Sequence, residues 1–296
     1  MTTDAHTRNG LILGIGAYTI WGLLPLYLRL LHGVPALQVL AHRVVWSVLL
    51  LAAIVVAVRR VGAIRVAARG RTLALLTASA TLIAVNWLVY IWSVQNGHVL
   101  EASLGYFINP LVNVALGMIV LGERITRLQG IAVAIAAAGV VALGADGLVS
   151  GGGAAWIPLT LAFSFGVYGL IRKVAAIDAL GGLTVETALL LVPATMLILT
   201  AQADGSGAFG QDRGVDVLLV MAGAITAAPL LMFAAAARRL RYATLGLLQY
   251  IAPTLQFLEA VLIFREPLRP VHLVTFALIW TGCTVYALGA RRRMAG

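Results

Sequence analysis

The sequence consists of long apolar runs separated by short polar segments. A helix that crosses a bilayer needs about 20 mostly apolar residues, because each residue advances about 1.5 Å through about 30 Å of hydrocarbon. The pattern predicts an all-α integral membrane protein with ten transmembrane helices. The predicted spans are residues 10–31, 36–58, 72–95, 100–121, 128–144, 154–172, 180–201, 215–237, 243–264 and 271–289.

Composition strengthens this prediction. Of the 296 residues, 61% are hydrophobic and only 11% are charged, and the mean hydropathy is +0.98. In a typical soluble domain, roughly a quarter of all residues are charged. A water-soluble enzyme of this size is therefore excluded. The net charge of +10 is distributed in short arginine clusters between the apolar runs, which argues against a nucleic-acid partner.

The cations also predict an orientation. If the N-terminus is cytoplasmic, 16 of the 21 lysines and arginines fall on the cytoplasmic side, and four fall on the outer side. Positive residues are enriched in cytoplasmic loops. Ten helices then place both termini in the cytoplasm. The four outer cations are Arg29, Arg213, Arg265 and Arg269.

The two halves of the chain resemble each other. The segment ASLGYFINPLVNVALGMIVLGERI matches ATLGLLQYIAPTLQFLEAVLIFREPL, with Pro110 aligned to Pro253. In each copy a glutamate follows the proline 13 residues later, at Glu123 and Glu266. The chain is therefore predicted to contain an internal repeat.

The repeat divides the chain into residues 1–144 and residues 154–296, two five-helix halves that are joined by a Gly-rich linker at 145–153. Because five is an odd number, the second half must enter the membrane from the opposite side. Such inverted repeats give many secondary transporters two similar states, each open to one face. Duplicated helices also build passive bundles, which is the alternative.

Polar side chains recur on single faces of three predicted helices. Taken one at a time, each could simply form a hydrogen bond between helices. Because these polar faces lie on helices related by the repeat, together they predict a shared cavity. Pro110 and Pro253 remove backbone donors in two of these helices and would let them bend. The candidate cavity residues are Asn86, Tyr90, Tyr106, Asn109, Asn113, Gln249 and Gln256.

Ionisable residues within the spans form a second candidate set. A charge at the bilayer centre costs on the order of 2.5–3.5 kcal/mol, so it is normally paired or solvated. Arg43 lies at a similar level to Glu101 and Glu259 near the outer side, which predicts that it pairs with one of them. An alternative for Glu101 is a carboxylate stabilised by a helix N-terminus. The set that could form charge contacts or couple transport to an ion is His42, Arg43, Glu101, Glu186 and Glu259.

Glu186 lies nearer the inner side than the other carboxylates of this set, and it could take part in proton coupling or merely lie at the membrane interface.

The sequence contains no Gly-Lys-Ser/Thr phosphate loop, no H-E-x-x-H and no G-x-S-x-G. Cys283 is the single cysteine, so no internal disulfide can form. We therefore expect no catalytic residues, no metal site and no cofactor, and we do not expect an enzyme.

Five segments resemble a known family. They are AYTIWGLLPLY (17–27), PALQVLAHRVVWS (35–47), NWLVYIWSVQNGHVLEASLGYFINPLVNVALG (86–117), SFGVYGLIRK (164–173) and GLLQYIAPTLQFL (246–258). The sequence is similar to the RarD subfamily of EamA-type transporters, which belong to the drug/metabolite transporter superfamily. The resemblance implies a ten-helix protein of the bacterial cytoplasmic (inner) membrane, built from two inverted halves.

The sequence thus predicts a secondary transporter, with export expected, of small metabolites or drug-like compounds by alternating access. The alternatives are a passive channel or facilitator, and a membrane scaffold that transports nothing. The expected partners are the lipid bilayer and a small-molecule substrate. Small residues along residues 130–138 would also allow a homodimer, although packing within one chain explains them as well.

Overall fold

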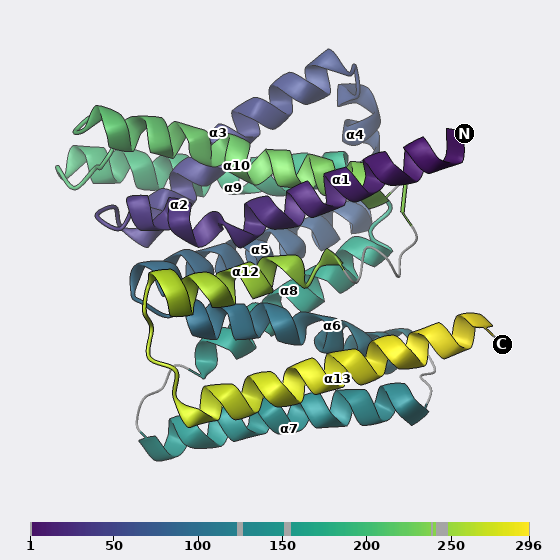
Figure 1. The fold of residues 1–296 in the computed structure, drawn as a ribbon. Coiled ribbons are helices and arrows are strands. Elements are labelled where there is room, and N and C mark those ends of the chain that lie inside the picture. The colour runs from purple at the N-terminus through teal and green to yellow at the C-terminus, as the bar shows by residue number, and fades with distance from the viewer. Residues whose placement is uncertain (1, 123–126, 151–154, 238, 241–247, 296) are drawn as a thin grey trace.

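The computed structural model describes residues 2–295 except for 123–126, 151–154, 238 and 241–247. Within this part of the chain the elements are all helices (Figure 1). They are α1 (Thr2–Gly22), α2 (Leu24–Leu30), α3 (Ala36–Ala57), α4 (Val61–Ala67), α5 (Gly70–Gln95), α6 (Val99–Leu121), α7 (Arg127–Ser150), α8 (Trp156–Val174), α9 (Ala179–Ala203), α10 (Arg213–Ala237), α12 (Ile251–Leu258), the π-helical segment η1 (Glu259–Ile263) and α13 (Pro270–Ala295).

Seven of the described helices are long and apolar enough to cross a membrane, and an eighth qualifies if the two bent parts of α6 form one span. The chain is therefore a multi-pass membrane protein. Two further apolar helices are shorter, at Ile251–Ile263 and Pro270–Val285, within the last two of the ten predicted spans. The predicted count of ten is not reached by helices of membrane length in the described residues.

Two predicted boundaries differ from the structure. Helix α7 continues to Ser150, so most of the predicted linker at 145–153 is helical, and the rest of it lies outside the described residues. The physical reason is that an existing helix gains one hydrogen bond for each residue it adds, and the one glycine in 145–150 does not outweigh this gain. The first predicted span is divided after Gly22, and Pro25 occupies the start of α2, where its missing N–H costs nothing.

Most long helices run side by side, and both chain termini lie at the same end of the bundle (Figure 1). Helix α7 packs along α13, and α3 packs against both α9 and α10. Helix α8 contacts α5 and α6, while α1 contacts α10 and α12. Helix α5 also contacts α9. These pairs bring residues from both halves of the sequence to the middle of the bundle.

Candidate functional site

Two helices at the middle of the bundle depart from regular α geometry. Helix α6 bends by 41° between Asn109 and Leu111, on either side of Pro110, which has no N–H to continue the helical ladder. Helix α12 carries Pro253 in its first turn and changes to π geometry at Glu259. Single π-helical turns are frequent at functional sites.

A buried polar group lies between α5, α6 and α8. The Tyr106 hydroxyl donates a hydrogen bond to Asn86 Oδ1 at 3.2 Å. Asn86 Nδ2 in turn donates to the Leu161 carbonyl and to Ser164 Oγ, each at 3.0 Å. The Tyr90 ring meets the Tyr106 ring edge to face at 5.4 Å. The structure therefore brings Asn86, Tyr90 and Tyr106 together.

Arg43 of α3 lies beside this group and does not form the expected ion pair. Its Nε donates to Thr226 Oγ1 of α10 at 2.6 Å, and its guanidinium lies 4.4 Å from the centre of the Trp87 ring. Neither Glu101 nor Glu259, nor any other carboxylate among the described residues, lies within 4.0 Å of it. The predicted ion pair is absent because the Arg43 side chain points towards α5 and α10. The depth of a residue in the membrane does not determine the direction in which its side chain points.

Glu259 of η1 is also buried, with 4% of its surface exposed, and neither carboxylate oxygen has a hydrogen-bond partner in the described part of the chain. Tyr90 lies within electrostatic range of both Glu259 and Arg43. We define the central cluster as Arg43, Asn86, Tyr90, Tyr106 and Glu259. It joins α3, α5, α6 and η1.

Several buried atoms in and around the central cluster have no hydrogen-bond partner among the described residues. Leaving such an atom unpaired costs about 1–3 kcal/mol, and more if it is charged. A cluster of them is therefore a place where polar groups of a ligand can be accommodated. In the central cluster these atoms are Arg43 Nη1, Tyr90 Oη, Glu259 Oε1 and Glu259 Oε2. Outside it, Asn109 Oδ1 and Gln256 Oε1 are also buried without a partner among the described residues.

The remaining predicted cavity residues are dispersed. Gln256 is buried and its Nε2 donates to the Trp21 carbonyl at 3.0 Å, which ties α12 to α1. Gln249 is half-buried in the turn before α12. Asn113 is exposed and lies beside Gly169 of α8. Asn113 therefore does not join the central cluster.

Glu186 of α9 anchors a second polar contact, and it is only 1% exposed. It accepts hydrogen bonds from Ser79 Oγ and, at 3.5 Å, from the Tyr168 hydroxyl. Arg172 Nη1 lies 3.7 Å from its carboxylate. Glu186 therefore lies inside the bundle, between α5, α8 and α9. His42, by contrast, is buried with its ring stacked on Phe209 at 5.2 Å.

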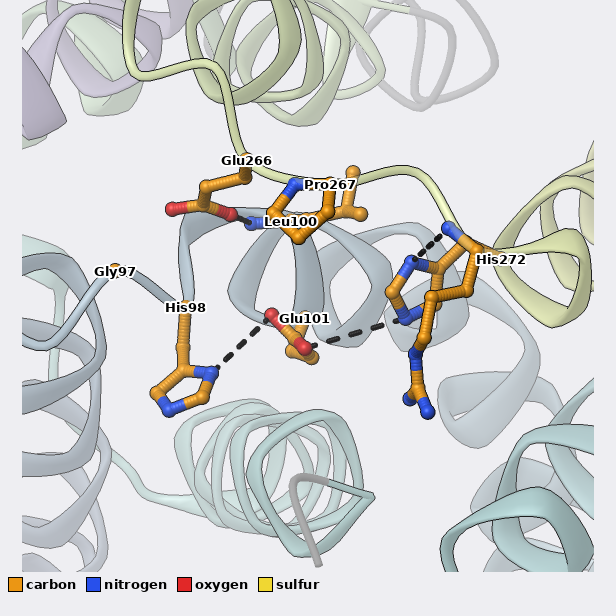
Figure 2. A pocket seen from close by; sticks show the side chains of 8 residues that line it. Gly97, His98, Leu100, Glu101, Glu266, Pro267 and His272 are labelled. Carbon is orange, nitrogen blue, oxygen red and sulfur yellow. Dashed lines mark hydrogen bonds and ion pairs between the residues drawn. The ribbon is translucent and has the colours of Figure 1, made fainter. Parts of the chain in front are cut away.

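A pocket of about 230 Å³ lies at the opposite end of the bundle from the termini. Glu266 borders it and accepts two backbone hydrogen bonds from the first turn of α6, from the Val99 N–H at 2.8 Å and the Leu100 N–H at 2.7 Å (Figure 2). Burial raises the pKa of Glu266 above its ordinary value, and the two N–H donors partly offset this. Sequence reasoning noticed Glu266 only through the repeat.

Glu101 lies between two histidines in the same pocket (Figure 2). Its carboxylate is 3.6 Å from His98 Nδ1 and 4.0 Å from His272 Nε2. These neighbours occupy the carboxylate that was expected to pair with Arg43. Thr226 contacts Arg43, and Ser79 contacts Glu186. Neither hydroxyl residue was predicted, because a single Ser or Thr in an apolar helix gives no distinctive sequence pattern.

Comparisons with known proteins agree in pointing to transport. Residues 8–145 match the EamA-like transporter family. The chain is 47% identical over 293 residues to an uncharacterized transporter of Pseudomonas aeruginosa, covering 98% of this chain and 97% of that protein. It is 45% identical over 288 residues to Protein RarD of Escherichia coli (strain K12), covering 96% of each.

Protein RarD of Streptomyces exfoliatus is 44% identical over 294 residues, covering 99% of this chain and 92% of that protein. A solved crystal structure shares the fold, with a TM-score of 0.63 at 20% identity, and it covers 96% of this chain and 99% of that one.

Proposed function

This chain belongs to the EamA-like transporter family and to its RarD group, and on that premise we propose that it is a secondary transporter that exports small metabolites or drug-like compounds across the bacterial cytoplasmic membrane by alternating access. The observation that carries the proposal is the central cluster. Buried, unpartnered polar atoms are costly within apolar helices and typically mark substrate or ion pathways.

Alternating access in this proposal depends on ten spans arranged as two inverted five-helix repeats. In that arrangement α1, α3, α5, α6 and α7 correspond to α8, α9, α10, α12 and α13. If the two halves are related by the repeat, each contact between two helices should recur between their counterparts. The contact α5–α8 then implies α10–α1, the contact α6–α8 implies α12–α1, and the contact α3–α10 implies α9–α5. Helices of every one of these pairs are in contact, as are the self-related pairs α3–α9 and α7–α13. This regularity supports the repeat.

Two side-chain contacts follow the same exchange. Arg43 of α3 contacts Thr226 of α10, and Glu186 of α9 contacts Ser79 of α5. Glu186 follows Arg43 by 143 residues, the spacing that also separates the two prolines of the repeat. This spacing supports Arg43 and Glu186 as counterparts of opposite charge in the two halves. Arg43 would lie nearer the outer face and Glu186 nearer the inner face.

Cysteine labelling tests the inversion. In a Cys283→Ala background, Arg127→Cys marks the start of α7 and Leu268→Cys marks the corresponding connection before α13; both positions are exposed. With an impermeant thiol reagent on intact spheroplasts, we expect labelling of the second variant only, and labelling of both after lysis. Equal labelling of both variants from outside would contradict inverted halves.

Transport itself is tested by comparing the metabolites released by deletion and overexpression strains, followed by counterflow of the released compound in proteoliposomes with and without a pH gradient. We expect saturable counterflow, which a channel does not give. Asn86→Ala should reduce it by tenfold or more, because Asn86 holds Tyr106 and contacts α8. Arg65→Gln, at an exposed position on α4, is the control and should not reduce counterflow. Flux without saturation or counterflow would contradict the proposal.

A further inference from the structure

The surroundings of Arg43 carry an inference about what the central cluster binds. We propose that Arg43 is the binding residue for a carboxylate of the transported molecule, so that the substrate class is a small organic anion with an apolar body. This inference rests on the proposed transport function, since it takes the central cluster as the substrate site. It assigns to Arg43 a role in recognition instead of the internal charge contact that its sequence position indicated.

Arg43 is a buried cation that has no counterion among the described residues. Its exposed fraction is 5%, and the described residues place no carboxylate within 4.0 Å of the guanidinium. Thr226 is a neutral acceptor and takes only the Nε donor, while Nη1 has no partner in the described part of the chain. A buried charge is normally paired, because removing it from water costs far more than hydrogen bonds to neutral groups return.

Three tyrosines surround the Arg43 guanidinium. The phenols of Tyr27, Tyr90 and Tyr106 interact with Arg43 electrostatically. Tyr27 already donates to the Leu218 carbonyl and Tyr106 to Asn86, whereas the Tyr90 hydroxyl is buried and unpartnered in the described structure. A carboxylate can accept from Arg43 Nη1 and from the Tyr90 hydroxyl at the same time. Arginine favours such planar anions because its donors are fixed in a fork.

Aromatic rings near Arg43 indicate what the body of the ligand is. The Trp87 ring lies 4.4 Å from the Arg43 guanidinium, and Tyr90 and Tyr106 pack edge to face beside it. Phe165 of α8 in turn contacts the Tyr106 ring at 6.2 Å. Aromatic walls around one fixed charge favour a ligand that joins a carboxylate to an apolar or aromatic skeleton. A strongly hydrated inorganic anion would gain little from these walls.

Glu259 does not act as the counterion of Arg43 in place of a ligand. Its own oxygens are unpartnered among the described residues, and no ion pair joins it to Arg43. Tyr90 interacts with both charges, so the two ionic groups border a common residue without neutralising each other. No described carboxylate pairs directly with Arg43, which leaves this position open to a carboxylate of the ligand.

Binding to the purified full-length protein in detergent tests the inference without requiring transport. The probes are acetate, benzoate and indole-3-acetate, each compared with its neutral amide at equal ionic strength and pH 7. The measurements are the shift in thermal unfolding temperature and the quenching of tryptophan fluorescence. We expect benzoate or indole-3-acetate to bind at least tenfold more tightly than its amide. If no carboxylate binds more tightly than the matching amide, the inference is wrong.

Variants assign the preference to Arg43. Arg43→Gln should bring the affinity for the carboxylate down to that of the amide, whereas Arg43→Lys should keep part of the difference. Arg60→Gln removes a cation from a partly exposed ion pair near the other end of α3. It should leave the difference in affinity between carboxylate and amide unchanged. Tyr90→Phe should weaken carboxylate binding severalfold even if Arg43→Gln does not fold. A preference that survives in Arg43→Gln or, should that variant not fold, in Tyr90→Phe would overturn the assignment.

Failure of this inference and failure of the proposed function are distinguishable. Binding that depends on Arg43 without any counterflow of the bound anion would leave the anion site standing and contradict transport. Saturable counterflow of a neutral or cationic compound, unaffected by Arg43→Gln, would confirm transport and contradict the anion site.

Discussion

Replacing Glu266 by alanine is expected to destabilise the folded protein by about 2–4 kcal/mol, because two buried N–H groups lose a charged acceptor. Val99 and Leu100 are each 1% exposed, so water cannot easily replace the carboxylate. The carboxylate also interacts favourably with the positive end of α6. The measurement is thermal and denaturant unfolding of the purified protein in a fixed detergent.

Two comparison variants make this result specific. Glu266→Gln keeps one acceptor oxygen and should lie between the alanine variant and the native protein. Leu268→Ala changes a partly exposed residue of the same connection and should have a small effect. An alanine variant at 266 that unfolds at the native temperature would mean that this contact between the two halves contributes nothing to stability.

The second large effect is expected for Gly223→Ala in α10. An added Cβ would lie 2.6 Å from the backbone carbon of Trp46 and 2.7 Å from its carbonyl oxygen, and a backbone atom cannot rotate away. Helices α3 and α10 must therefore separate. Overpacking of this kind costs about 1–3 kcal/mol, more than the gain of up to about 1 kcal/mol in helix propensity. We expect a lower unfolding temperature.

The same substitution should also disturb the central cluster. Thr226 lies three residues after Gly223, and Arg43 lies three residues before Trp46, so separation of the helices lengthens the Arg43–Thr226 contact. Carboxylate binding should weaken together with stability. The matched control is Gly144→Ala in α7, where no atom lies within 4 Å of the added Cβ. That variant should be as stable as the native protein or slightly more so, and equal stability of the two variants would contradict the close helix approach.

Much of the candidate site could be predicted from the periodicity of polar residues. Asn86 and Tyr90 are separated by about one helical turn, so they share a face in any helical arrangement, and the contact with Tyr106 follows once α5 meets α6. The partner of Arg43 could not be predicted in this way. Depth in the membrane follows from residue number, whereas the direction of a side chain depends on how its helix is rotated against its neighbours.

Repeated membrane crossing and family membership follow from the amino-acid sequence alone, since both depend on local composition and on residue order. The sequence also pointed to the polar faces, because a helix fixes the spacing of its own side chains. Helix packing was needed to establish that Arg43 contacts Thr226 and Trp87, that Glu186 contacts Ser79, and that Glu266 accepts from the first turn of α6. These contacts join residues more than 40 positions apart, and they form only where helices distant in the sequence pack against each other.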